Sequence, residues 1–229
     1  MQLALTSTSL DLTHNNSQFI SARINDAHRK NLENTVKEGF LLAYNAKLTS
    51  FMPLLCQYIT EQGKCTLGLR QATSPLFIEQ YLASPVENFL EESISRNKIF
   101  ELGNLCSTNR RATLAHFIIV NEALQSVGAK HLVFCATNKV RALLRLLGVT
   151  CTEIALASSF VVENPSKWGS YYANQPTVCI VSLEQAHQQV LNTPLLYSLM
   201  QQNHKKINSL VNALVNALVN ALVNALVNV

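Results

Sequence analysis

Apolar positions change along the chain from a helical period to short strand-like runs and back. Between residues 27 and 46 apolar side chains recur every three or four positions and charged residues occupy the other side, which predicts an amphipathic helix. Its apolar stripe consists of Leu32, Val36, Phe40 and Ala43. Two apolar runs then flank a polar stretch with Gly63, and they predict a hairpin of strands at 53–60 and 65–72.

Prolines and glycines divide the middle of the chain into shorter elements. Pro75 and Pro85 each follow a serine, and they predict the starts of two short helices that cover one side of the early strands. An apolar strand at 98–106, a polar bend, and a helix at 111–127 ended by Gly128 come next.

A second apolar strand, at 130–137, follows this helix. Strand, helix and strand in this order predict a right-handed crossover between two parallel strands. The pattern continues with a helix at 138–148, strands at 149–156 and 177–183, and a helix from Glu184. Together these elements predict an α/β fold, with a mixed sheet and helices on both faces.

The chain ends in a strict repeat, in which LVNA occurs four times and LVNV closes residues 210–229. In a helix, a four-residue period overshoots 3.6, so the leucine stripe rotates by about 40° per repeat and forms no fixed seam. An asparagine in every unit makes it a poor membrane span, although its length of roughly 30 Å would just cross a bilayer. We predict an extension at 1–26, one domain at 27–200 and a helical tail at 201–229, with membrane or partner association as the alternative for the tail.

Composition narrows the class of protein. A chain of 229 residues with 48% hydrophobic and 14% charged residues is expected to bury a sizeable core. The net charge of +4 comes from scattered basic residues, which argues against a nucleic-acid partner. The six cysteines form no CxxC pair and the six histidines no ligand spacing, so we predict no metal. The N-terminus has no signal-peptide pattern, so we expect a cytoplasmic location.

The bend at 107–110 joins an apolar strand to a helix. The unpaired N–H groups at a helix start favour an anionic group, and Arg110 and Arg111 add positive charge there. An ordinary capped helix with solvated arginines explains the same residues, with Ser107, Thr108 or Asn109 as the N-cap.

Three phrases of the sequence resemble a known family. They are GLRQATSPLFIEQYL at 68–82, FELGNLCS at 100–107 and WGSYYANQPTVC at 168–179. In this order and spacing they are similar to the thermostable hemolysin family of bacterial proteins, over about residues 35–183. That family in turn resembles GNAT-fold acyltransferases and acyl-homoserine-lactone synthases. The resemblance implies a GNAT-like fold and the transfer of an acyl group from a thioester to an amine.

In a GNAT-like sheet the two parallel strands splay apart and the phosphopantetheine arm of the donor lies in the opening. The resemblance therefore implies phosphate or phosphopantetheine at the bend, held by Asn109, Arg110, Arg111, Ala112 and Thr113. GNAT proteins usually have glycines in this bend and STNRRA has none, which favours acyl carrier protein over free CoA as the donor.

An acyl carrier protein is acidic, so it requires a basic face. Lys139, Arg141 and Arg145 lie on one short predicted helix beside the bend and are candidates for docking it. The alternative is that these three are solvated helix charges.

Glu101 is the first candidate for the general base or for orienting the amine, because a carboxylate in an apolar strand has a raised pKa when it is buried. A structural salt bridge is its alternative role. Arg70 could grip a carboxylate of the acceptor, and Glu79 and Tyr81 could pair with Arg70. A purely structural ion pair explains Arg70 and Glu79 equally well. Asn104, in FELGNLCS, is a further candidate for substrate binding.

Three aromatic residues lie within five positions of each other. Trp168, Tyr171 and Tyr172 could wall a substrate pocket, with a tyrosine hydroxyl protonating the leaving thiolate, or they could cap the core.

These observations favour an N-acyltransferase that uses an acyl carrier protein or CoA thioester and an amine such as an amino acid, with no permanently bound cofactor. Two other classes stay open. One is a membrane-active hemolysin that acts through an exposed apolar surface or the LVNA helix. The other is a non-catalytic protein that binds acyl carriers.

Overall fold

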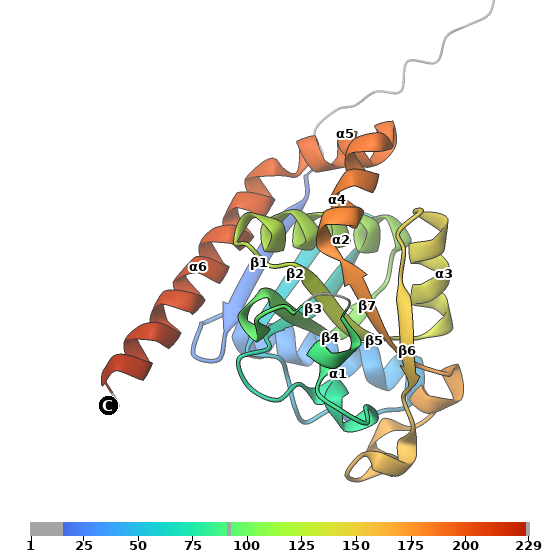
Figure 1. Cartoon of the computed structure of the whole chain (residues 1–229). Helices are drawn as coiled ribbons and strands as arrows, with labels where there is room; N and C mark the ends of the chain where they lie inside the picture. The colour runs from blue at the N-terminus through green and yellow to red at the C-terminus, as the bar shows by residue number, and fades with distance from the viewer. Residues whose placement is uncertain (1–15, 91–92, 228–229) are drawn as a thin grey trace, which may run out of the picture.

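Seven strands form one mixed sheet in the order β1-β2-β3-β4-β5-β7-β6 in the computed structural model, which describes residues 16–90 and 93–227 (Figure 1). Neighbouring strands are antiparallel except for β4 and β5, which are parallel as predicted. The strands are β1 Gln18–Arg23, β2 Leu54–Thr60, β3 Gly63–Gln71, β4 Ile99–Ser107, β5 His131–Ala136, β6 Thr152–Leu156 and β7 Thr177–Ser182.

Helices cover both faces of this sheet, which confirms the predicted fold class (Figure 1). One face packs against α1, and the other packs against α2, which in turn contacts α4, α5 and α6. The helices are α1 Arg29–Tyr44, α2 Arg110–Ser126, α3 Asn138–Leu146, α4 Leu183–Asn192, α5 Pro194–Gln202 and α6 His204–Val227.

The two faces of β4 differ in chemistry because side chains alternate along a strand. Phe100 and Leu102 join the core on the α2 side. Ile99 belongs to a second core on the opposite side, where Glu101 also lies. The alternation therefore places the buried carboxylate on the face away from α2.

The structure differs from the sequence-based prediction in the first strand and in the segment after β3. β1 lies in the predicted extension 1–26, where it pairs with β2 as an edge strand. The two short helices predicted at Pro75 and Pro85 are 3-10 helices, η1 Phe77–Tyr81 and η2 Val86–Phe89, and a third, η3, spans Arg96–Lys98. Pro85 itself has an extended backbone with ψ of 148°, so the helical turn begins one residue later than predicted.

The beginning of the repeat is part of the core. Leu210 and Leu214 of α6 are buried in the same hydrophobic cluster as α2, and the Arg23 side chain donates a hydrogen bond to the Ala213 carbonyl. These two leucines belong to the first two repeats, which therefore pack against α2. None of the helices in the described ranges combines the length and the hydropathy that a bilayer crossing requires.

Truncation of the repeat is expected to have two different effects, depending on the cut. Removal of residues 218–229 should leave the free energy of unfolding nearly unchanged, because Leu210 and Leu214 stay in place. Removal of residues 210–229 should cost about 4 kcal/mol, since both leucines are lost from the core. Urea unfolding of the two truncated proteins measures the difference, and equal stabilities would contradict this account of α6.

Candidate active site

The parallel strands β4 and β5 separate midway along the sheet. Their ladder runs from the pair Ile99–His131 to the pair Leu102–Phe134, and β4 then continues to Ser107 without β5 as a partner. On its other side β4 contains a bulge, since Asn104 and Leu105 together face a single position of β3. The bulge and the end of the ladder open a gap at the centre of the sheet.

The bulge is fixed by the loop before β2. Asn104 has a left-handed backbone with φ of 52°, its Oδ1 accepts a hydrogen bond from the Met52 N–H (2.7 Å), and its Nδ2 donates to the Ser50 carbonyl (3.3 Å). The Met52 side chain covers Gly103, where an added Cβ would lie 2.4 Å from the Met52 Cε. The side-chain amide of Asn104 therefore holds the bulge, and a role in substrate binding stays a prediction.

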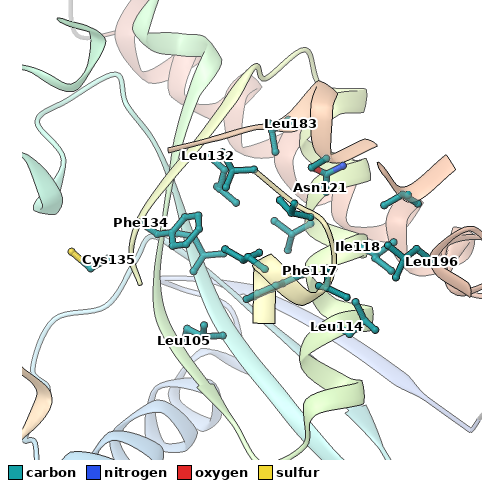
Figure 2. A pocket seen from close by; sticks show the side chains of 18 residues that line it. Leu105, Leu114, Phe117, Ile118, Asn121, Leu132, Phe134, Cys135, Leu183 and Leu196 are labelled. Atoms are coloured by element: carbon teal, nitrogen blue, oxygen red, sulfur yellow. The ribbon is translucent and has the colours of Figure 1, made fainter. Parts of the chain in front are cut away.

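Two cavities meet at this gap. The apolar chamber lies on the α2 side, has a volume of about 750 Å³ with its open mouth, and is lined mainly by leucine, isoleucine, valine and phenylalanine side chains (Figure 2). The polar chamber lies on the opposite face and has a volume of about 900 Å³ on the same measure. Leu102, Leu105 and Cys135 line both chambers. A linear molecule could therefore extend from one chamber into the other through the gap.

Glu101 is the charged centre of the polar chamber. Its side chain is only 1% exposed, and its carboxylate accepts hydrogen bonds from the backbone N–H groups of Phe77 (3.1 Å) and Ile78 (3.0 Å) at the start of η1. Burial raises the pKa of Glu101, while the two backbone hydrogen bonds and the nearby Arg70 partly oppose this. A carboxylate with a raised pKa in a cavity has the character of a general base.

Arg70 lies directly opposite Glu101 on β3 and also lines the polar chamber. Glu79 forms its ion pair with Arg96 (2.7 Å) instead of Arg70, which corrects the expected pairing. Arg96 also pairs with Glu87, so it joins η1 to η2. The sequence indicated the residue types correctly, but the choice of partner depends on how the segment 72–98 folds back.

The ion pair of Glu79 is expected to make the fold sensitive to acid. Burial alone would raise the pKa of Glu79, but the hydrogen bonds from Arg96 and from the backbone N–H groups of Val86 and Leu76 lower it to about 2. This stabilisation is fully present above the unfolded pKa of about 4.3 and is lost as the pH falls toward the folded pKa. Glu79→Gln should lower the free energy of unfolding at neutral pH by about 1–2 kcal/mol, and by less in acid. Urea unfolding of both proteins across this range measures it, with the exposed Glu61→Gln as control, and equal losses in the two variants would contradict it.

Aromatic side chains form one wall of the polar chamber. Trp168 packs against Phe77 with 5.6 Å between ring centroids, and the Tyr81 and Tyr172 hydroxyls are hydrogen-bonded at 2.7 Å, so the 165–174 segment is joined to η1. Burial raises the pKa of Tyr81, Tyr171 and Tyr172. Their hydroxyls thus stay protonated at neutral pH and can act as donors. Trp168, Tyr171 and Tyr81 line the chamber.

The bend before α2 is a capped helix start. The Asn109 side chain accepts hydrogen bonds from the N–H groups of Arg111 (2.8 Å) and Ala112 (3.0 Å), and the Thr113 N–H donates to the Asn109 carbonyl (3.0 Å). Three of the backbone groups that were expected to hold a phosphate, those of Arg111, Ala112 and Thr113, are therefore occupied within the helix start, and phosphate binding at the bend stays a prediction. The side chains of Arg110 and Arg111 are exposed.

Arg141 is also engaged within the fold. Its guanidinium donates to the carbonyls of Ala136 and Gln175 and to the Thr177 hydroxyl, and it forms an ion pair with Glu153 (3.2 Å). Arg141 therefore ties the ends of three strands together, which corrects its assignment to carrier docking. Lys139 and Arg145 are exposed, and their docking role stays a prediction.

Sequence reasoning missed two features of the site. Phe77 contributes a backbone donor to Glu101 and a wall of the polar chamber, but nothing in LFIEQYL distinguishes it from a core residue. Asn121 lines the apolar chamber from within an apolar helix, where a single asparagine carries no pattern.

Comparisons with known proteins agree with this architecture. The AHL synthase LasI superposes with a TM-score of 0.52 at 12% sequence identity, over 74% of this chain and 91% of that one. BjaI, a CoA-dependent acyl-homoserine lactone synthase solved with SAM and isopentyl-CoA, has a TM-score of 0.50 at 12% identity, over 84% of this chain and 90% of that one. These likenesses show that the chain has the fold of such synthases.

A comparison with curated protein sequences finds no match. The sequence model of the family described as thermostable hemolysin matches residues 22–187, from the end of β1 into α4. This range includes most of the sheet, both chambers' central residues and all three phrases that carried the resemblance. The chain belongs to the thermostable hemolysin family.

Proposed function

We propose that the protein is an N-acyltransferase that moves an acyl group from a thioester to the amine of an amino acid or a related acceptor. The observation that carries the proposal is the junction of the two chambers, where buried Glu101 and its neighbour Arg70 lie on one side of the gap and an apolar cavity lies on the other. An acyl chain suits the apolar chamber, and a small charged acceptor suits the polar one. The fold shared with acyl-homoserine-lactone synthases supports the same reaction class.

The chemistry needs positioning and proton transfer. The amine nitrogen attacks the thioester carbonyl carbon, so that a C–N bond forms and the C–S bond breaks. Glu101 accepts the proton that the ammonium loses, and the Tyr171 hydroxyl, kept protonated by its raised pKa, is placed in the same chamber to protonate the leaving thiolate. Tyr172 supports this chamber through its hydrogen bond with Tyr81. Arg70 binds the carboxylate of the acceptor through its planar fork.

The donor reaches the gap from the end where β4 and β5 part. Arg110 and Arg111 begin α2 at that edge and Lys139 lies in the first turn of α3, so exposed cationic side chains surround the entrance. Because the N–H groups of Arg111, Ala112 and Thr113 are occupied, we propose that side chains contact the phosphate of the donor. The same charges suit an acidic acyl carrier protein, whose docking they would steer.

Haemolysis, which gives the family its name, fits this function as a secondary effect. An acylated amino acid combines an apolar chain with a charged head, and such amphiphiles disturb membranes. Haemolysis by a product would therefore need no contact between the protein and the membrane.

A panel of acyl carrier protein and acyl-CoA thioesters, incubated with the full-length protein and pooled amino acids, tests the proposal. Mass spectrometry is expected to detect an N-acyl amino acid that forms only with protein, thioester and amine together. If no product appears with any donor, and liposomes leak when the protein alone is added, these results would contradict the proposed function and favour direct action on membranes.

The size of the apolar chamber is expected to set the length of the acyl chain. Ala186 of α4 is buried and lines the chamber, so Ala186→Phe should fill part of it. We expect kcat/KM for the longest accepted acyl donor to fall at least about 10-fold, with little change for the shortest. Initial rates for donors of increasing length measure it, and Ala186→Val should give a graded effect. A uniform loss for all chain lengths would contradict this use of the chamber.

A further inference from the structure

One polar side chain stands out in the apolar chamber. Among the residues of the described chain that line it, Asn121 is alone in carrying a carboxamide or a charge, and it is only 7% exposed. In the view of Figure 2, Asn121 lies toward the Leu183 end of the chamber, away from Leu105 and Cys135. A buried carboxamide at the end of an apolar cavity requires hydrogen-bond partners.

One half of this carboxamide has a fixed partner. Asn121 Nδ2 donates to Glu122 Oε1 (3.0 Å), and Glu122 Oε2 contacts His187 Nδ1 (2.7 Å). The carboxylate of Glu122 thus accepts from the nitrogen side of the Asn121 amide and leaves the oxygen side for another partner. Asn121 Oδ1 then has no hydrogen-bond donor within the described part of the chain, although it is not fully enclosed by protein atoms, and the residue lines the chamber.

The position of Asn121 along the chamber decides what it can meet. The reacting carbonyl belongs at the gap, at the level of Cys135, because the chambers share this residue. Gln125, one helical turn after Asn121, donates a hydrogen bond to the Leu183 carbonyl (2.7 Å), and Ser182 pairs with His131, four residues before Cys135 and so about 13 Å along the strand. Asn121 thus faces the distal part of a bound acyl chain and not its first carbons.

We propose that Asn121 selects acyl donors that carry a hydroxyl group in the distal half of the chain. The hydroxyl donates a hydrogen bond to Asn121 Oδ1, whereas an unsubstituted chain of the same length leaves this oxygen buried without a donor. A 3-hydroxyl group lies too close to the thioester to reach it. This inference rests on the proposed function, since it assigns the acyl chain to the apolar chamber.

Competition between matched donors tests the inference. Full-length protein receives thioesters of one chain length that are unsubstituted, 3-hydroxylated, or hydroxylated in the distal half. We expect kcat/KM to favour the distally hydroxylated donor by about 10- to 100-fold over both others. Asn121→Leu should abolish or reverse this preference, while Asn208→Leu, the same change on an exposed residue of α6, should retain it.

A binding measurement on the wild-type protein separates this inference from the proposed reaction. Displacement of a fluorescent apolar probe compares the free fatty acid with its distally hydroxylated counterpart, and it needs neither turnover nor a variant. Tighter binding of the hydroxylated acid without any acyl transfer would support the inference and count against the proposed function. Equal binding, or an unchanged donor preference in Asn121→Leu, would overturn the inference and indicate that water satisfies Asn121.

Discussion

Replacing Glu101 by glutamine is expected to lower the rate of acyl transfer by about 10²- to 10⁴-fold, the usual contribution of a positioned general base. The substitution keeps the shape of the side chain but cannot accept a proton from the ammonium. It also exchanges one carboxylate oxygen beside Phe77 and Ile78 for an amide nitrogen, which should cost about 1 kcal/mol of stability. The protein should therefore stay folded and still bind the thioester.

Steady-state rates and thermal unfolding of Glu101→Gln measure these two effects separately. Glu153→Gln, on the edge strand β6, is a matched control that leaves both chambers intact and should retain turnover. Unchanged turnover in Glu101→Gln would remove the carboxylate from the mechanism. Lost thioester binding would instead indicate a structural role.

The pH dependence of the rate follows from the direction of the pKa shift. A base must be deprotonated to act, and burial raises the pKa of Glu101, so turnover should begin to fall at a higher pH than an ordinary glutamate would give. The stability of the folded protein depends on pH in the opposite direction to the rate. Because the pKa of Glu101 is raised in the folded protein, the folded protein binds this proton more tightly than the unfolded chain does. This contribution to stability is therefore present below the pKa of the unfolded state and is lost as the pH rises through the pKa of the folded state.

Replacing Arg70 by methionine is expected to raise the KM for the amine acceptor by about 100-fold. Arg70 is the one cationic side chain in the described lining of the polar chamber, and a charge-assisted hydrogen bond to a carboxylate contributes about 1.5–3 kcal/mol. The neighbouring Glu101 also loses the positive charge that lowers its pKa. The acidic limb of the rate profile should therefore move to higher pH.

Arg70→Lys distinguishes the two roles of the arginine. Lysine restores the charge, so the pH profile should return toward that of the wild type, but it cannot form the bidentate contact, so the KM should stay high. An acceptor without a carboxylate should show no difference in KM between these variants. If both variants bind the acceptor as the wild type does, the carboxylate site lies elsewhere.

Most of the fold could be predicted from local pattern. Apolar period, glycines and prolines placed the hairpin of β2 and β3, the crossover through α2 and the final strand close to their observed bounds. β1 was missed because QFISAR is short and its strand exists through pairing with β2. The burial of Leu210 likewise depends on where α2 lies, which a repeat with no fixed seam does not indicate.

The candidate site was predictable in its residue types and less so in its contacts. Glu101 and Arg70 could be selected from the sequence because a charged side chain in an apolar strand needs a partner or a function. The partners of Glu79 and Arg141 depend on segments far away in the sequence, so spacing could not identify them. Asn109 was named among the possible caps, and as the cap it occupies the N–H groups of Arg111 and Ala112 that were expected to hold a phosphate.

The central claim is that an amine in the polar chamber attacks a thioester held across the gap. Its most direct test is the rate of thiol release from one accepted acyl thioester, measured with full-length protein in the presence and absence of the amine acceptor. We expect thiol release that depends on the amine, saturates with it, and yields one N-acyl product per thiol. Thiol release at the same rate without amine would identify a thioesterase and contradict the claim.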